Sequence, residues 1–130
     1  MSTKAKASES ASVPVKKKGV ARLIAATGYS IAGLRSAFSS EEAFRLEVFA
    51  LIIALPLAFY FGQTPVEQIL LIGSIILVMI VELLNTSVEA VVDRVGVEFH
   101  PLAREAKDIG SAAVFVAMAF AGFTWLMLLL

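Results

Sequence analysis

Two glutamates and an asparagine interrupt one of the most hydrophobic segments of the chain, residues 79–93. On an α-helix, Glu82 and Glu89 project within about 20° of each other, because seven positions make almost two full turns. Asn85 and Asp93 lie close to the same line. An ionised side chain at the centre of a bilayer costs roughly 2.5–3.5 kcal/mol, so such groups usually face a bundle interior. The pattern predicts a polar stripe at a functional site, and a structural network of hydrogen bonds between helices is the alternative.

The composition places the chain among membrane proteins. Of its 130 residues, 58% are hydrophobic and 17% are charged, which is too apolar for a soluble domain of this length. The formal net charge is +0, so the charge of the whole chain suggests no nucleic-acid partner. There are no cysteines, hence no disulfide framework and no thiolate metal site. We expect a small all-α integral membrane protein.

The N-terminal part is expected to stay on the cytoplasmic side of the membrane. Residues 1–19 are rich in Ser, Ala and Lys and predict a flexible basic tail that touches anionic headgroups. In residues 20–39 the apolar side chains fall within about 100° of helical arc, which predicts an amphipathic helix at the membrane surface. Arg22, Tyr29 and Arg35 lie outside that arc, where interfacial anchoring is the alternative to catalysis.

Three further helices, over residues 41–61, 66–93 and 106–130, are predicted to contain the membrane spans, since a span needs about 20 residues. Ser39 and Ser40 are expected to cap the first of them, and residues 62–65 read as a tight turn. That turn has no Lys or Arg, whereas residues 94–108 and the N-terminal region have several. The positive-inside rule therefore predicts three spans with a cytoplasmic N-terminus.

This topology gathers several polar residues near the cytoplasmic membrane face. Carboxylates at Glu41 and Glu89 are suited to hold a hard cation such as Mg²⁺, Glu82 is suited to remove a hydroxyl proton, and Lys107 to pair with phosphate. The set fits phosphoryl transfer. The chain has no glycine-rich phosphate loop and no protein-kinase motif, so general motifs do not identify a nucleotide site.

One signature is more specific. Glu82-Leu-Leu-Asn85-Thr-Ser-Val-Glu89, followed by Ala-Lys107-Asp108, closely resembles the prokaryotic diacylglycerol kinase family. The earlier Gly28-Tyr-Ser and Gly33-Leu-Arg elements also match, and the similarity covers roughly residues 21–130.

The resemblance implies a single membrane kinase domain over residues 20–130, assembled as a homotrimer in the bacterial inner membrane. Its implied activity is phosphorylation of 1,2-diacylglycerol by ATP with Mg²⁺ at the cytoplasmic face, with composite sites shared between subunits. Glu82 is the implied base, and Glu41 and Glu89 are the implied metal ligands. The implied ATP-binding residues are Arg22, Tyr29, Glu98, His100, Lys107 and Asp108. The implied lipid-substrate residues are Arg22, Arg35, Glu47, Glu82, Asn85, Ser111 and Trp125.

Three alternatives stay open at this point. Undecaprenol kinases carry the same Glu-Asn-Glu and Ala-Lys-Asp elements, although the segments around Gly28, Gly96 and Gly110 look more like the diacylglycerol branch. A small proton-coupled transporter would also place glutamates in the membrane. A helical accessory subunit would pair its polar stripe with a partner. The Lys107-Asp108 pair has no evident role in either of the last two.

Overall fold

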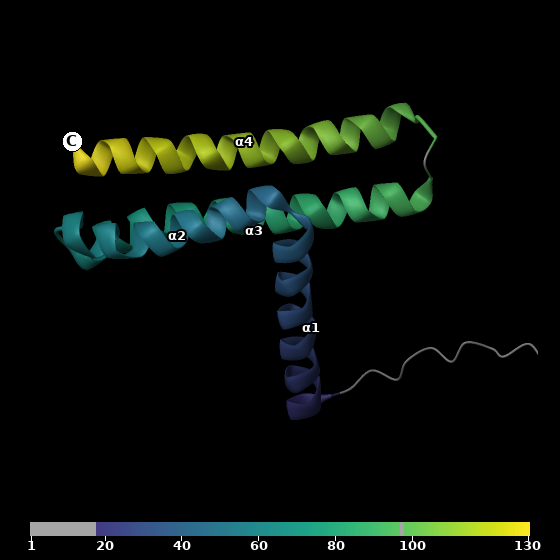
Figure 1. Ribbon diagram of the computed structural model, residues 1–130, viewed down its shortest axis with the longest axis horizontal. Coiled ribbons are helices and arrows are strands. Elements are labelled where there is room, and N and C mark those ends of the chain that lie inside the picture. Colours follow the sequence, from purple (N-terminus) through teal and green to yellow (C-terminus); the bar gives the residue numbers. More distant parts are fainter. Residues whose placement is uncertain (1–17, 97) are drawn as a thin grey trace, which may run out of the picture. The chain divides into compact units, whose positions relative to one another are not determined.

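The protein is entirely helical over the residues that the computed structural model describes, 18–96 and 98–130. Four helices follow one another: α1 (Gly19–Ser40), α2 (Glu42–Phe61), α3 (Pro65–Val95) and α4 (Pro101–Leu129) (Figure 1). The predicted all-α class is confirmed. Of the predicted N-terminal tail, residues 1–17 lie outside the described part. The assignment of residues 20–130 to one domain stays a prediction.

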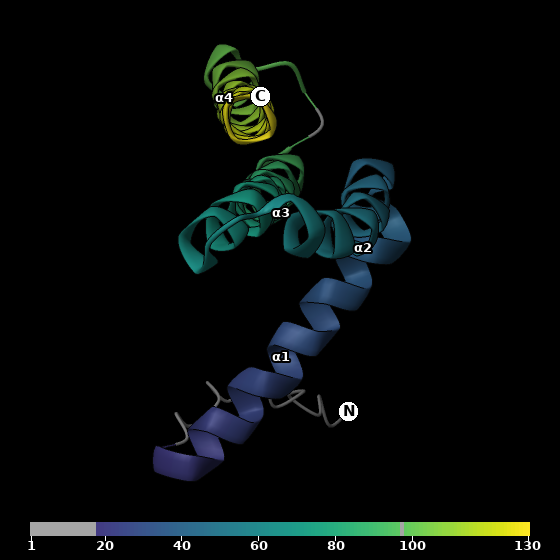
Figure 2. The same cartoon turned by 90° about the vertical axis from the view of Figure 1, so that its left-hand side faces the viewer.

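Helices α2, α3 and α4 are each long and apolar enough to cross a membrane. Within the unit formed by residues 34–130, α3 packs against both α2 and α4. Figure 2, which looks nearly along the three helices, shows α3 between the other two. The few side chains buried between these helices are mostly small or aliphatic, including Ala54, Ala58, Leu71 and Ala117. Small residues let the backbones approach closely, which is how helices associate in lipid.

Helix α1 is continuous for 22 residues, and its first part, up to Gly33, forms a unit of its own. Leu23 and Ile24 are exposed there, as is Tyr29. An exposed apolar stripe on a helix of this length is typical of burial at the headgroup boundary.

The corner between α1 and α2 is built differently from the predicted cap. Ser39 and Ser40 lie in the last turn of α1, where both hydroxyls donate to the carbonyl of Ser36. Glu41 is extended and precedes α2 without a side-chain cap. The expectation that the two serines cap α2 is therefore wrong, because both belong to the last turn of α1 and Glu41 takes the N-cap position of α2.

Arg45 stabilises this corner instead. Its Nη1 donates to the carbonyls of Phe38 and Ser39, at 2.9 and 3.0 Å. These are two of the carbonyls that the end of a helix leaves without an internal partner. The guanidinium of α2 thus caps α1 and holds Glu41 at a sharp corner.

The turn between α2 and α3 agrees with its predicted position. Thr64 accepts a hydrogen bond from the backbone N–H of Glu67, whose carboxylate in turn accepts from the N–H of Gln63. This reciprocal arrangement is a variant of the capping box, and Pro65 occupies the first helical position. At Gly62 a Cβ would come within 2.6 Å of Gln68 Cγ and 2.7 Å of the Ala58 carbonyl oxygen, so the close approach requires glycine.

Helix α4 begins at Pro101, earlier than the residue 106 expected from the sequence. The imidazole Nδ1 of His100 accepts from the N–H of Leu102 at 3.1 Å, and Pro101 fills the first helical position. Proline suits that position because its missing N–H would have no partner there. The mixed charges of residues 101–108 therefore belong to the first two turns of α4 rather than to a loop.

Candidate active site

A cluster of carboxylates surrounds the middle of α3. Glu82 is buried, with 7% of its surface exposed, and it is the only buried charged residue in the described part of the chain. Glu41 and Glu89 are near enough for their charges to act on Glu82, and Glu82 is near enough for its charge to act on Glu47. Glu41 stands at the α1–α2 corner, Glu47 on α2 and Glu89 two turns further along α3. These four carboxyl groups, two of them on α3, are therefore close enough to influence one another electrostatically along the predicted polar stripe.

Asn85 links this cluster to α4. Its Nδ2 donates to Glu89 Oε1 at 3.3 Å, one helical turn away. On its other side the amide lies directly against Gly110 of α4, where an added Cβ would collide with Oδ1. The residue therefore fills the interface between α3 and α4 while it orients a carboxylate.

Two polar atoms of the site are buried without a hydrogen-bond partner, Glu47 Oε2 and Asn85 Oδ1. Buried polar atoms in folded proteins are nearly always satisfied, so exceptions mark sites where water, an ion or a ligand completes the structure. Both atoms belong to the predicted lipid-substrate set. The arrangement supplies carboxylates for proton transfer or cation binding, and an interior position that excludes most water.

The predicted metal ligands carry the type of donor atom that Mg²⁺ prefers. Glu41 and Glu89 offer hard carboxylate oxygens, and Mg²⁺ is commonly held by one or two carboxylates with waters and substrate phosphates completing its shell. Within residues 18–96 and 98–130, no group of three or more His, Cys, Asp or Glu side chains converges as a metal cage. A cation at this site would therefore depend on phosphate oxygens or on a neighbouring subunit for further ligands.

A second polar region lies where α3 ends and α4 begins. A pocket of about 400 Å³ is lined by Glu98, His100, Arg104 and Lys107 together with Asp93. Lys107 Nζ lies 2.7 Å from Asp93 Oδ1, and Arg104 pairs with Asp108 at 3.2 Å. Three of the six predicted nucleotide residues, Glu98, His100 and Lys107, thus share one pocket. Another of them, Asp108, is paired with Arg104 of the pocket lining.

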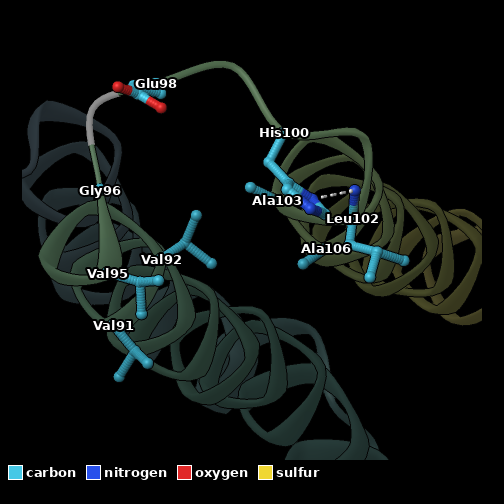
Figure 3. Close-up of a pocket in the computed structure, with 9 residues that line it drawn as sticks. All are labelled: Val91, Val92, Val95, Gly96, Glu98, His100, Leu102, Ala103 and Ala106. Carbon is cyan, nitrogen blue, oxygen red and sulfur yellow. Dashed lines mark hydrogen bonds between the residues drawn. The ribbon is translucent and has the colours of Figure 1, made fainter.

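The same junction has an apolar side. A pocket of about 710 Å³ shares Glu98 and His100 with the polar one and is otherwise lined mainly by small aliphatic side chains. Figure 3 shows these residues coming from the last turns of α3, from the connection and from the first turns of α4: Val91, Val92, Val95, Gly96, Glu98, His100, Leu102, Ala103 and Ala106. An apolar pocket next to one lined by charged side chains of both signs can accept a planar ring beside charged groups.

The remaining predicted residues do not line either pocket at the junction of α3 and α4. Arg22 and Tyr29 belong to the first part of α1, which forms a separate unit. Arg35 and Ser111 are exposed. Trp125 donates from Nε1 to the carbonyl of Leu71 at 3.0 Å, so its indole joins α4 to the first turns of α3. At about 1.5 Å per residue, Leu71 is roughly 16 Å along α3 from Glu82.

Three residues with clear structural roles escaped the sequence analysis: Gly110 against Asn85, Arg45 at the α1–α2 corner, and Arg104 beside Asp108. Arg104 and Asp108 are four residues apart, a spacing that predicts an ion pair on a helix. This prediction requires that α4 begins as early as Pro101. The partners of Gly110 and Arg45 depend on which helix faces meet, which no local pattern specifies.

Comparison with known proteins gives a consistent result. The family model described as prokaryotic diacylglycerol kinase matches residues 28–129. A protein of Haemophilus influenzae named diacylglycerol kinase is 52% identical over 110 residues, covering 85% of this chain and 93% of that protein. Proteins of the same name from Escherichia coli K12 and Pseudomonas aeruginosa are 50% and 47% identical, each covering 91% of the relative and 85% and 86% of this chain.

Proposed function

The chain belongs to the prokaryotic diacylglycerol kinase family, and we propose that it transfers the terminal phosphoryl group of ATP to the free hydroxyl of 1,2-diacylglycerol. The products are phosphatidate and ADP. The observation that carries the proposal is the buried Glu82 among the carboxylates of Glu41, Glu47 and Glu89. A lipid hydroxyl is one of the few substrates that reach a carboxylate at this depth in an apolar helix bundle.

Glu82 is the general base of the proposed reaction. The diacylglycerol oxygen forms a bond to the terminal phosphorus, the bond from that phosphorus to the bridging oxygen of ADP breaks, and the hydroxyl proton passes to the Glu82 carboxylate. Glu47 and Asn85, each with a buried side-chain oxygen that has no protein partner, belong to the proposed lipid-binding set. Arg22, Arg35, Ser111 and Trp125 complete the proposed set of lipid contacts.

Glu41 and Glu89 are the proposed ligands of Mg²⁺, which when bound would neutralise phosphate charge. Asn85 positions Glu89 through the hydrogen bond from Nδ2. This bond restricts the rotamers of the Glu89 carboxylate before any ligand arrives. Partners of this kind typically affect metal affinity or activity by about 10–100-fold.

The nucleotide is proposed to bind at the junction of α3 and α4. Lys107 would exchange its contact with Asp93 for phosphate oxygens, and His100 and Glu98 border both the polar and the apolar pocket there. Asp108 from the same helix, with Arg22 and Tyr29 from α1, would complete the ATP contacts. We further propose a homotrimer in the bacterial inner membrane, with the site at the cytoplasmic face and the N-terminus inside.

Phosphate transfer to defined lipids tests the proposal. Purified protein in mixed micelles is given labelled ATP and Mg²⁺ with 1,2-diacylglycerol and undecaprenol offered side by side, and each lipid product is separated and counted. We expect the label in phosphatidate. Transfer mainly to undecaprenol would show that undecaprenol is the substrate. Transfer to neither lipid would contradict the proposed kinase activity and would favour the alternative of a proton-coupled transporter.

A further inference from the structure

Gly110 occupies a position on α4 where no side chain fits. An ideal Cβ built there would collide with Asn85 Oδ1 and would lie 3.3 Å from Asn85 Cγ, but 3.9 Å from Asn85 Cβ. The obstacle is therefore the amide of Asn85 and not its Cβ. At Gly73 and Gly122, which also lie inside the long apolar helices, the same construction meets no atom within 4 Å. Gly110 thus differs from Gly73 and Gly122 because it faces the side chain of Asn85.

The orientation of the Asn85 amide explains why the oxygen points at Gly110. The NH₂ group must face Glu89, because a carboxylate accepts hydrogen bonds and the amide oxygen cannot donate one. The oxygen is then turned toward α4, where it is buried with no N–H or O–H partner. The Cα hydrogen of Gly110 that replaces a Cβ points at this oxygen, and such Cα–H···O contacts recur where helices cross closely.

We propose that Gly110 is a positioning residue that holds the Asn85 amide in the orientation that donates to Glu89. With any side chain at position 110, the amide would have to rotate or α4 would have to move away. Rotation of the amide would break the hydrogen bond of 3.3 Å to Glu89 Oε1, whereas displacement of α4 would remove the contact that keeps the amide in its orientation. The inference rests on the proposed function in one respect, since it takes Glu89 as a ligand of Mg²⁺.

The first test compares Gly110→Ala with the matched control Gly122→Ala in the same helix. Alanine has a higher helix propensity than glycine at both positions. A loss of Mg²⁺ affinity that occurs only at position 110 therefore reports the collision with Asn85. We expect Gly110→Ala to raise the Mg²⁺ concentration for half-maximal activity by about 10–100-fold, as loss of a partner that orients a metal ligand does. Gly122→Ala should stay within about twofold, and equal effects at both positions would overturn the proposal.

The second test needs neither ATP nor Mg²⁺. Thermal unfolding in detergent is measured for Gly110→Ala, Asn85→Ala and the double variant, which completes a double-mutant cycle. We expect Gly110→Ala to lower the melting temperature in the parent but not in the Asn85→Ala background, because the remaining Cβ at 3.9 Å is an ordinary contact. Equal losses in both backgrounds would contradict a contact between the two side chains.

The two tests also separate the possible failures. If Gly110→Ala does not fold alone, recovery of the folded state in the double variant supports the proposal, and failure of both overturns it. A parent protein that transfers no phosphate to any lipid would remove the proposed function. The unfolding cycle would still decide whether Gly110 positions Asn85.

Discussion

At the scale of single residues, the central feature is a carboxylate held in the interior of an apolar helix bundle. Glu82 is 7% exposed, and Glu41 and Glu89 lie near enough to repel it. Burying like charges together is unfavourable unless a proton, a cation or a substrate balances them. The cluster is therefore better suited to bind and transform a ligand than to stabilise the fold.

We expect Glu82→Gln to reduce turnover by about 10²–10⁴-fold, the usual contribution of a general base. Glutamine keeps the shape and the hydrogen-bonding capacity but cannot take the hydroxyl proton. The measurement is turnover beside nucleotide binding and thermal unfolding, both of which should stay close to the parent. Near-normal turnover would remove Glu82 from the role of base.

Replacing Glu41 or Glu89 with alanine is expected to raise the Mg²⁺ requirement of the reaction. Because ligands of one cation act as a unit, the double replacement should cost less than the sum of the two single losses. Activity measured over a range of Mg²⁺ concentrations for the three variants provides the comparison. Additive losses with an unchanged Mg²⁺ dependence would instead indicate two independent structural carboxylates.

At the scale of the elements, α3 is joined to α4 near both of its ends. The indole of Trp125 donates to the carbonyl of Leu71 at one end, and Lys107 pairs with Asp93 at the other. Asn85 and Gly110 meet between them. These contacts fix the register of the two helices and so hold the carboxylates of α3 against a defined face of α4.

Trp125→Phe tests whether this residue serves mainly the pairing of helices. Phenylalanine keeps the aromatic ring but removes the N–H donor to Leu71, and hydrogen bonds between membrane helices contribute about 0.6–2 kcal/mol. We expect a fall of this size in the free energy of unfolding, measured by denaturation in mixed micelles, with turnover at saturating diacylglycerol changed less than about threefold. A large rise in the KM for diacylglycerol at unchanged stability would show instead that the indole N–H serves only the proposed lipid contact and not the pairing of α3 with α4.

At the scale of the whole molecule, the three long helices leave most of their apolar side chains exposed in a single chain. Lipid can cover those side chains, but it cannot satisfy the buried oxygen of Glu47 or complete a cation shell. A cyclic assembly would supply further groups through repeated heterologous contacts. We therefore expect active sites that are shared between subunits of a homotrimer.

Mixing two inactive variants tests this expectation. Glu82→Gln and Lys107→Ala subunits are unfolded together, refolded into micelles and assayed for phosphate transfer. If Glu82 and Lys107 of one site come from different chains, some mixed trimers regain an intact site and part of the activity returns. No recovery, in samples that crosslinking shows to contain mixed oligomers, means that both residues act within one chain or that the protein is not a trimer.

The sequence by itself determined the class of the protein and the identity of its polar stripe. Continuous apolar segments of about 20 residues cross lipid as helices, because a helix satisfies each backbone N–H and C=O within the segment itself. The spacing of Glu82, Asn85 and Glu89 then places them on one face by helical geometry alone. For the same local reason the turn at residues 62–65 was predictable, and the His100-Pro101 pair already contained the signal for the start of α4.

Only the tertiary structure decided which groups the stripe meets. Ser39 and Ser40 have the residue types of a cap for α2, yet they form the last turn of α1. The carbonyls of Phe38 and Ser39 at that end of α1 accept from the guanidinium of Arg45, which the corner brings close. No local helical pattern indicates that Gly110, unlike Gly122, lies against the side chain of Asn85, and this difference arises from the face of α3 against which Gly110 packs. Local patterns depend on neighbours along the chain, whereas these contacts depend on how whole helix faces fit together in space.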